Sequence, residues 1–251
     1  MNPALRHATD PIATRSSNGL EDVRPVLVLG AGAIGCYLGG CLQAAGVPVV
    51  FVGRPRVLAA LREHGLTLSD LDQHHQHLAA SALNLHDAVP AGLAPTLVLL
   101  AVKSGATTEA AALLARALPA GTPVVSMQNG IGNADLARTA APGLRWLAGM
   151  VPFNVAELAP GHFHRGTPGA LAAQDDAALR ALAPDFERAG LGLRLHADLR
   201  AVQWGKLLLN LNNLAIIGCS HQHRLVLPAH TPGQCGQQHS VRYHGQAQRP
   251  Q

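Results

Sequence analysis

The stretch VLVLGAGAIG, residues 26–35, decides the fold of this 251-residue chain. An apolar run typical of a buried strand leads directly into a Gly-x-Gly-x-x-Gly turn, and the small residues that follow can form a helix. In that context the first glycine permits a tight turn, the second lets the backbone approach a pyrophosphate, and the third allows close helix–strand packing. The pattern predicts a dinucleotide-binding turn, with a glycine turn that serves packing alone as the alternative. Its residues are Gly30, Ala31, Gly32, Ala33, Ile34 and Gly35.

Apolar runs alternate with amphipathic segments through most of the remaining sequence. Strands are predicted at 26–29, 47–52, 96–102, 123–126, 145–151 and 191–195, and helices at 36–45, 55–64, 107–118, 132–140, 175–189 and 198–217. We expect a hairpin or loop at 66–85 and an antiparallel addition at 163–171. This order is typical of an α/β fold, a Rossmann-like doubly wound parallel sheet, here followed by a long helix. The predicted parts are a flexible leader (1–24), a dinucleotide-binding domain (25–197), a helical segment (198–218) and an irregular tail (219–251).

The end of the second predicted strand indicates which dinucleotide binds. NAD enzymes carry an acidic residue about 20 positions after the first glycine, where it binds the ribose 2′-hydroxyl. Here the strand ends in Gly53-Arg54-Pro55-Arg56, without a carboxylate. An arginine can form a forked contact with a 2′-phosphate, so NADP(H) is the predicted cofactor. The alternative is that Arg54 or Arg56 is a solvated surface charge.

Two polar residues follow the next two predicted strands. Lys103 follows the apolar run at 97–102, and Asn129 follows the strand at 123–126. Open α/β sheets bind ligands at the carboxyl ends of their strands, so both side chains are expected to face one crevice. The alternative for Lys103 is an ordinary surface lysine. The chain has only two lysines, which argues against that alternative. For Asn129 the alternative is an ordinary Asn-Gly turn.

The second lysine lies on the predicted helix at 198–217. Lys206, Asn210 and Asn213 are spaced i, i+4 and i+7, so they share one stripe among leucines. Polar groups in such surroundings are costly unless they are paired or serve a ligand. We expect the amides to bind carboxylate or hydroxyl groups and Lys206 to donate a proton to a carbonyl oxygen as hydride arrives. The alternative is an ordinary amphipathic helix whose polar face is exposed to solvent.

Taken together, these motifs resemble one enzyme family over residues 26–218. They are Gly30–Gly35, Gly53-Arg54, Ala101-Val102-Lys103, Gln128-Asn129-Gly130 and Trp204-x-Lys206-Leu207-x-x-Asn210. The combination is similar to the ketopantoate reductase (2-dehydropantoate 2-reductase) family. The resemblance implies NADPH-dependent reduction of 2-dehydropantoate to pantoate in pantothenate synthesis, with Lys206 as proton donor and Asn210 as a substrate ligand. Lys103 and Asn129 would line the cofactor and substrate crevice. The family's second helix asparagine corresponds to Leu214, so Asn213 is the candidate replacement.

The resemblance also implies that 25–197 is an NADP-binding Rossmann-like domain and that 198–218 is the first helix of an all-helical C-terminal substrate domain. The sequence departs from that family after Gly218. The family's helical domain supplies a substrate-binding serine and a glutamate, whereas this chain has no acidic residue after Asp198. We therefore expect a reading-frame shift or truncation near Gly218, which DNA sequencing tests: without a shifted frame that encodes an acidic helical segment, the idea fails. Two alternatives to the leading function stay open, an inactive dinucleotide-binding remnant and a reductase of another 2-oxo acid.

Charge and composition argue against nucleic acid and membranes as binding partners. The formal charge of +4 divides into −1 for residues 1–198 and +5 for residues 199–251, so no general basic surface for nucleic acid is expected. No apolar run approaches the roughly 18 residues of a membrane helix, and the four cysteines form no Cys-x-x-Cys pair. We expect a cytoplasmic enzyme that acts on a small 2-oxo acid and has no metal site. A homodimer is compatible with the sequence. The tail histidines, His221, His223, His230, His239 and His244, match no zinc pattern.

Overall fold

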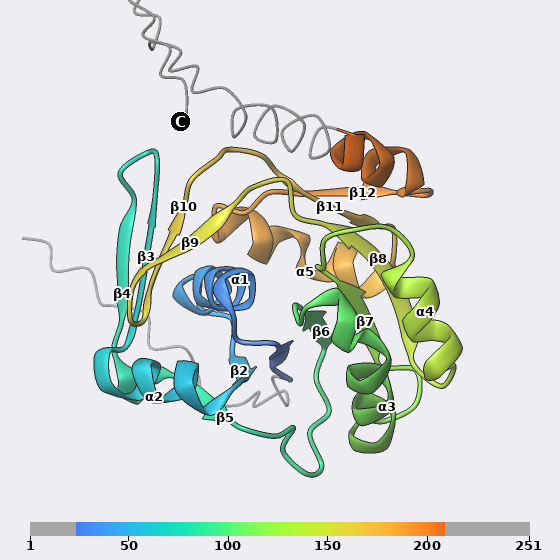
Figure 1. The fold of residues 1–251 in the computed structure, drawn as a ribbon, viewed down its shortest axis with the longest axis horizontal. Coiled ribbons are helices and arrows are strands. Elements are labelled where there is room, and N and C mark those ends of the chain that lie inside the picture. The colour runs from blue at the N-terminus through green and yellow to red at the C-terminus, as the bar shows by residue number, and fades with distance from the viewer. Residues whose placement is uncertain (1–23, 209–251) are drawn as a thin grey trace, which may run out of the picture. The chain divides into compact units, whose positions relative to one another are not determined.

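The computed structural model describes residues 24–208, which are built around an eight-stranded sheet (Figure 1). The strand order is β12-β11-β8-β7-β6-β1-β2-β5, and every neighbouring pair is parallel except β8 with β11. Its strands are β1 (Val26–Leu29), β2 (Val49–Val52), β5 (Asn84–His86), β6 (Leu97–Leu100), β7 (Pro123–Ser126), β8 (Arg145–Met150), β11 (Leu171–Gln174) and β12 (Leu193–His196). The predicted doubly wound α/β fold is therefore confirmed.

Helices cover both faces of this sheet. They are α1 (Ala33–Ala44), α2 (Pro55–His64), α3 (Thr107–Ala117), α4 (Asn133–Ala140) and α5 (Ala177–Arg188), with short 3₁₀ turns η1 (Ala80–Ala82) and η2 (Ser104–Ala106). Residues 200–208 are also helical. Pro55 begins α2, where its missing N–H costs nothing, and Gly65 follows its end. No helix among residues 24–208 combines the length and apolarity needed to cross a membrane.

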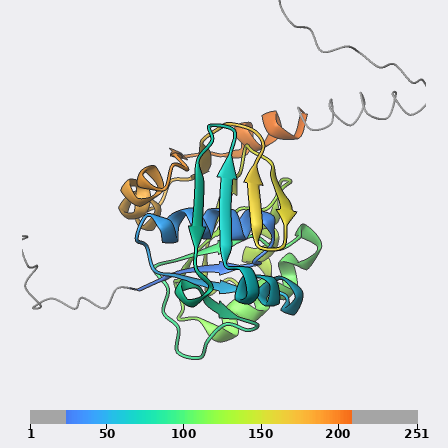
Figure 2. The same cartoon turned by 90° about the vertical axis from the view of Figure 1, so that its left-hand side faces the viewer.

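A second sheet lies over α1 (Figure 2). It has the order β4-β3-β10-β9, with β3 (Leu66–Asp70), β4 (His75–Leu78), β9 (Val155–Ala159) and β10 (His162–Arg165). Alternation places Leu66, Leu68 and Phe163 in the core cluster that contains α1, so α1 is enclosed between the two sheets. The predicted hairpin within 66–85 is the β3–β4 pair.

The core lies on both sides of the main sheet. In β1, Val26 and Val28 join the cluster with α1 and α5, and Leu27 and Leu29 join the cluster with α3 and α4. All four residues are buried, which explains why this strand is a continuous apolar run and not an alternating one. The strand from which the glycine turn emerges is therefore held from both faces.

The predicted antiparallel addition at 163–171 corresponds to two strands, each with an antiparallel partner: β10 pairs with β9 and β11 with β8. Residues at its two ends belong to different sheets, because β10 ends at Arg165 and β11 begins at Leu171. The intervening Gly166-Thr-Pro-Gly169 contains a proline, which cannot donate to a strand ladder, and a glycine at φ +135°. Strand β5 was also not predicted as part of the main sheet, and α1 begins at Ala33, earlier than the expected position 36.

The structure leaves several predictions outside its described residues. The expected leader lies there apart from Arg24, as does the tail at 219–251 with its histidines. The helix expected at 198–217 is described only over 200–208, so Asn210 and Asn213 have no described position.

Candidate functional site

The site lies at one edge of the main sheet, where the carboxyl ends of β1, β2, β6 and β7 meet. Strand β1 has β2 on one side and β6 on the other, so the chain changes direction across the sheet at this point. Backbone hydrogen bonds hold the ends together: Gly30 N–H donates to Val52 O (2.9 Å), and Ala101 N–H donates to Leu29 O (2.8 Å). Such a switch point is where doubly wound sheets bind their ligands.

Two glycines of the turn are required by close backbone contacts. Gly30 has φ +106°, and a Cβ there would lie 2.6 Å from the Val102 nitrogen. A Cβ on Gly35 would lie 2.1 Å from the Gly30 carbonyl oxygen. These residues therefore keep the turn pressed against β6 and α1 pressed against β1, as the motif predicts.

Gly32 differs from both because a Cβ there would meet nothing within 4 Å. It is exposed, stands at the N-cap of α1, and leaves that helix without a side-chain cap or an acidic residue in the first turn. The first intrahelical bond is Cys36 N–H to Gly32 O (2.8 Å), so the earlier N–H groups point out of the helix end. A pyrophosphate fits this open, positively polarised position.

Arg54 lies at the end of β2, beside the glycine turn. It is the exposed N-cap of α2, and the preceding Gly53 is so close to the turn that a Cβ would lie 2.6 Å from the Ala31 Cβ. Arg56, by contrast, directs its guanidinium toward Glu157 of β9, at 3.6 Å. Arg54 therefore follows the residue that contacts the turn, whereas Arg56 has an ion-pair partner in β9.

Lys206 contacts the part of this edge that is formed by the segments after β7 and β8. Its Nζ donates to Asn129 Oδ1 (2.8 Å) and to the Val151 carbonyl oxygen. Its side chain is partly buried, and this burial lowers the pKa of the ammonium below its ordinary value. The structure thus joins two residues that the sequence marked separately.

Lys103 lies next to the same pair through its neighbour. It is exposed, lies three residues after the end of β6 and is the N-cap of η2, and the hydroxyl of the following Ser104 donates to Asn129 O (2.9 Å). The loops after β6 and β7 are therefore tied together, with Lys103 and Asn129 on neighbouring segments.

A small hollow of about 20 Å³, open to solvent and large enough for about one water molecule, adjoins Lys206 and Asn129. Its lining residues come from the end of β7, from β8 and from the helix at 200–208: Gln128, Asn129, Gly130, Gly149, Met150, Gln203, Lys206 and Leu207. Its ammonium, amide and backbone groups can form hydrogen bonds with an oxygen atom placed there. A proton held on Lys206 could be given to an oxygen in this hollow.

Gln128 had no assigned role within the sequence motif Gln128-Asn129-Gly130, and its side chain is buried. Its side chain forms hydrogen bonds with Ser126, Thr107 and the Val102 carbonyl. The signal was present, because two polar residues spaced i, i+2 at the end of an otherwise apolar strand share one face.

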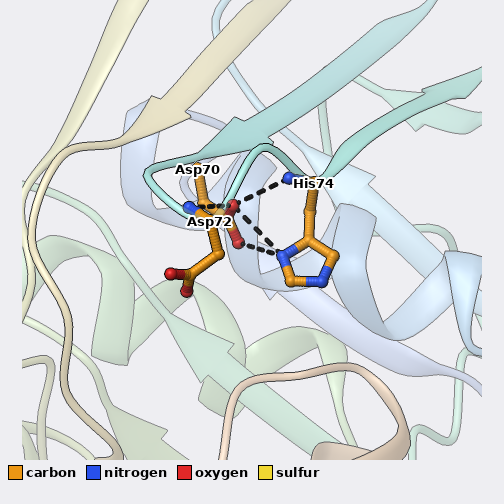
Figure 3. Close-up of side chains that lie close together, drawn as sticks. All are labelled: Asp70, Asp72 and His74. Atoms are coloured by element: carbon orange, nitrogen blue, oxygen red, sulfur yellow. Dashed lines mark hydrogen bonds and ion pairs between the residues drawn. The ribbon is translucent and has the colours of Figure 1, made fainter.

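Another polar cluster, Asp70, Asp72 and His74, lies at the β3–β4 turn (Figure 3). Asp70 Oδ1 accepts from the backbone N–H of Asp72 (2.9 Å) and of His74 (3.0 Å), and the His74 ring nitrogen lies 3.0 Å from Asp70 Oδ2. These bonds, which form the turn, account for the cluster. It lies in the second sheet and is not among the residues that line the hollow.

The two described cysteines lie on α1. Burial raises the pKa of both Cys36 and Cys41 to about 12, so neither thiol is a ready nucleophile.

Comparison with known families gives one match that spans more than half of the chain. The family model described as "Ketopantoate reductase PanE/ApbA" matches residues 26–177. The 2-dehydropantoate 2-reductase of Pyrococcus abyssi is 39% identical over 110 residues, which cover 44% of this chain and 34% of that protein. The enzyme of the same name from Halobacterium salinarum is 28% identical over 225 residues, covering 83% of this chain and 73% of that protein. The chain thus spans about a third of the Pyrococcus relative.

Solved structures show the same fold. A PanE/ApbA family ketopantoate reductase from Ralstonia eutropha JMP134 has a TM-score of 0.67 and 31% identity, over 74% of this chain and 61% of that one. The 2-dehydropantoate 2-reductase of Geobacter metallireducens GS-15 has a TM-score of 0.64 and 27% identity, over 74% and 62%. D-mandelate dehydrogenase in complex with NADH has a TM-score of 0.58 at 20% identity, a likeness of fold alone.

Proposed function

The chain belongs to the ketopantoate reductase family, and from that premise we propose that it reduces the 2-oxo group of 2-dehydropantoate with NADPH to give pantoate. The observation that carries the proposal is the Lys206–Asn129 hydrogen bond of 2.8 Å, at the same sheet edge from which the glycine turn emerges. It brings a proton donor to the sheet edge where a hydride donor would bind. The relatives' names support a 2-oxo acid reductase of this kind.

The residues at the turn fit a dinucleotide. Gly32 leaves open space, α1 presents uncapped N–H groups, and Gly30 and Gly35 fix the backbone around them. NADPH bound there would supply the hydride that reduces the 2-oxo carbon. Arg54 supports NADPH over NADH, because an exposed guanidinium beside the turn can form charge-assisted bonds with a 2′-phosphate.

Lys206 supplies the proton in the proposed reaction. As the carbonyl carbon accepts hydride, the C=O π electrons move to oxygen, and the Nζ proton passes to that oxygen to form the hydroxyl. Its lowered pKa makes Lys206 a better acid near neutral pH than a solvated lysine. Asn129 and the Val151 carbonyl orient the ammonium toward the hollow through the hydrogen bonds that they accept.

Turnover of NADPH with 2-dehydropantoate by the full chain tests the proposal. We expect oxidation at an ordinary enzymatic rate, on the order of 1 s⁻¹ or more. Lys206→Met should lower kcat by about 10²- to 10⁴-fold, the usual contribution of a general acid, while NADPH still binds. The control is Arg116→Met, which removes an exposed cation from the last turn of α3.

Two other results would redirect the proposal. Tight NADPH binding without turnover of 2-dehydropantoate or any other 2-oxo acid would favour the remnant. Turnover of a different 2-oxo acid with unchanged dependence on Lys206 would instead retain the mechanism and replace the substrate.

A further inference from the structure

Gln128 is a buried amide with almost every hydrogen-bonding group paired. It is 6% exposed. Its Nε2 donates to the Val102 carbonyl (3.0 Å) and to Thr107 Oγ1 (2.9 Å), and its Oε1 accepts from Ser126 Oγ (2.9 Å). Both amide hydrogens are thus used, on two different segments that follow β6, while the oxygen bonds to β7.

These bonds continue to the proposed catalytic lysine. Thr107 Oγ1, which accepts from Gln128, donates to Ser104 O (2.7 Å). Ser104 Oγ donates to Asn129 O (2.9 Å), and Asn129 Oδ1 accepts from Lys206 Nζ (2.8 Å). Asn133 Nδ2 from α4 also donates to Asn129 O (2.9 Å). The path therefore runs from the start of α3 through both strand-end loops to the helix at 200–208.

A glutamine is an unusual choice for packing alone at this position. The residues before Ser126 in β7 are apolar and buried, and an apolar residue at 128 would avoid the cost of burying an amide. Gln128 is adjacent along the chain to Asn129, so its side chain anchors the backbone from which the Asn129 amide projects. Because a fully paired buried network holds a single geometry, it restricts where that amide can lie.

We propose that Gln128 is a positioning residue, which fixes the Asn129 amide and, through it, the Lys206 ammonium at the edge of the sheet. The proposal rests on the proposed function in assigning Lys206 a catalytic role. Gln128 itself donates no proton to the substrate. Its effect is to hold the donor where the reacting oxygen would lie, a kind of placement for which an error of about 1 Å can cost 100-fold in rate.

The two-lysine composition makes Lys206 directly observable. A chain labelled with ¹³C-lysine has only two lysine ε-carbon resonances, from Lys103 and Lys206. The key variant is Gln128→Met, which keeps the approximate side-chain size and removes all three hydrogen bonds. We expect the Lys206 resonance to move toward the position of an exposed lysine and its titration to shift to higher pH, because a released ammonium is better hydrated.

Kinetics give a second readout of the same variant. Gln128→Met should lower kcat by about 10- to 100-fold, leave the KM for NADPH within about threefold, and move the alkaline limb of the pH profile upward. Thr107→Val removes one hydroxyl of the path, so it should lower kcat and move the alkaline limb upward by smaller amounts. Thr107→Ser keeps that hydroxyl and should restore wild-type behaviour.

Controls separate positioning from general loss of stability. Leu182→Ala weakens the core through α5 and should leave the Lys206 resonance and titration unchanged. If Gln128→Met does not fold, the Thr107→Val and Thr107→Ser pair provides the same comparison. A wild-type Lys206 titration in folded Gln128→Met, or in Thr107→Val, would overturn the proposal. If the wild-type chain does not turn over 2-dehydropantoate, the proposed function fails while the lysine titrations still decide the role of Gln128.

Discussion

Lys206 shows at the scale of a residue how surroundings set chemistry. Partial burial lowers its pKa, while the Asn129 and Val151 oxygens accept hydrogen bonds from Nζ and keep the ammonium in place. Lys103 has the same functional group but is exposed, beyond the end of β6. The assignment of the proton donor to Lys206 therefore rests on location and contacts and not on residue type.

Arg54 is expected to decide the choice between NADPH and NADH. Arg54→Ser should raise the Kd for NADPH by about 10- to 100-fold, because charge-assisted hydrogen bonds to the 2′-phosphate are lost, and should leave the Kd for NADH nearly unchanged. Titration of cofactor fluorescence measures both constants. Arg56→Ser is the matched control, since that guanidinium faces Glu157. Equal loss for the two cofactors would refute this role.

At the scale of an element, the β1–α1 turn separates folding from binding. Gly35→Ala places a methyl group 2.1 Å from the Gly30 oxygen and should destabilise the chain by several kcal/mol or prevent folding. Gly32→Ala meets no neighbour, so it should fold normally yet bind NADPH at least about 10-fold more weakly, because its methyl group occupies space that a pyrophosphate needs. Thermal unfolding and cofactor titration of both variants test this contrast. Equal stability of the two, or wild-type binding by Gly32→Ala, would contradict it.

The four-stranded sheet should respond to acid. His162 lies 2.8 Å from Ser69 Oγ, and burial, with smaller contributions from His75 and His164, lowers its pKa. The folded state then takes up this proton less readily than the unfolded chain. The stability that the folded state gains from holding His162 neutral is fully present above the pKa of histidine in the unfolded chain, about 6.5. It decreases as the pH falls below that value.

Urea unfolding at about pH 8 and about pH 5 measures that dependence. In His162→Gln the loss of stability between the two pH values should be smaller than in the wild type, because the titrating ring is gone. His196→Gln, in β12, is the control and should retain the wild-type loss. An unchanged loss in His162→Gln would show that other groups carry the acid sensitivity.

At the scale of the whole described molecule, the main sheet couples two core clusters. Leu114 of α3 is in one cluster and Leu179 of α5 in the other, and both are fully buried. Because β1 contributes side chains to both clusters, Leu114→Ala and Leu179→Ala should each lower the free energy of unfolding by about 2–5 kcal/mol in a single transition.

Urea unfolding followed by circular dichroism tests this coupling. NADPH at about 100 times its Kd should add about 2.7 kcal/mol to each variant, because the ligand binds the folded sheet edge. Leu136→Ala, at a 48% exposed position on α4, is the control and should have little effect. Two separate transitions, one for each cluster, would show that the sheet does not unfold as a unit.

Most of the main sheet could be predicted because its strands are continuous apolar runs. Val26–Leu29, Leu97–Leu100 and Pro123–Ser126 are buried at every position, and each run ends where the site begins. Short edge strands escaped notice for the opposite reason. Strand β5 has only three residues, and β9 is largely exposed, so neither has a strong pattern.

By itself the sequence determined the doubly wound fold, the glycine turn, and the residue types at its edge, because these depend on local periodicity and on backbone space at single positions. Only the tertiary structure decided which of them meet. Asn129 and Lys206 are 77 positions apart, and β3 pairs with β10 across more than 90 positions, distances that no local pattern encodes. Asn129 reaches the edge from which the glycine turn emerges because the parallel strands β7 and β1 align their carboxyl ends there, and the helix at 200–208 brings Lys206 to it.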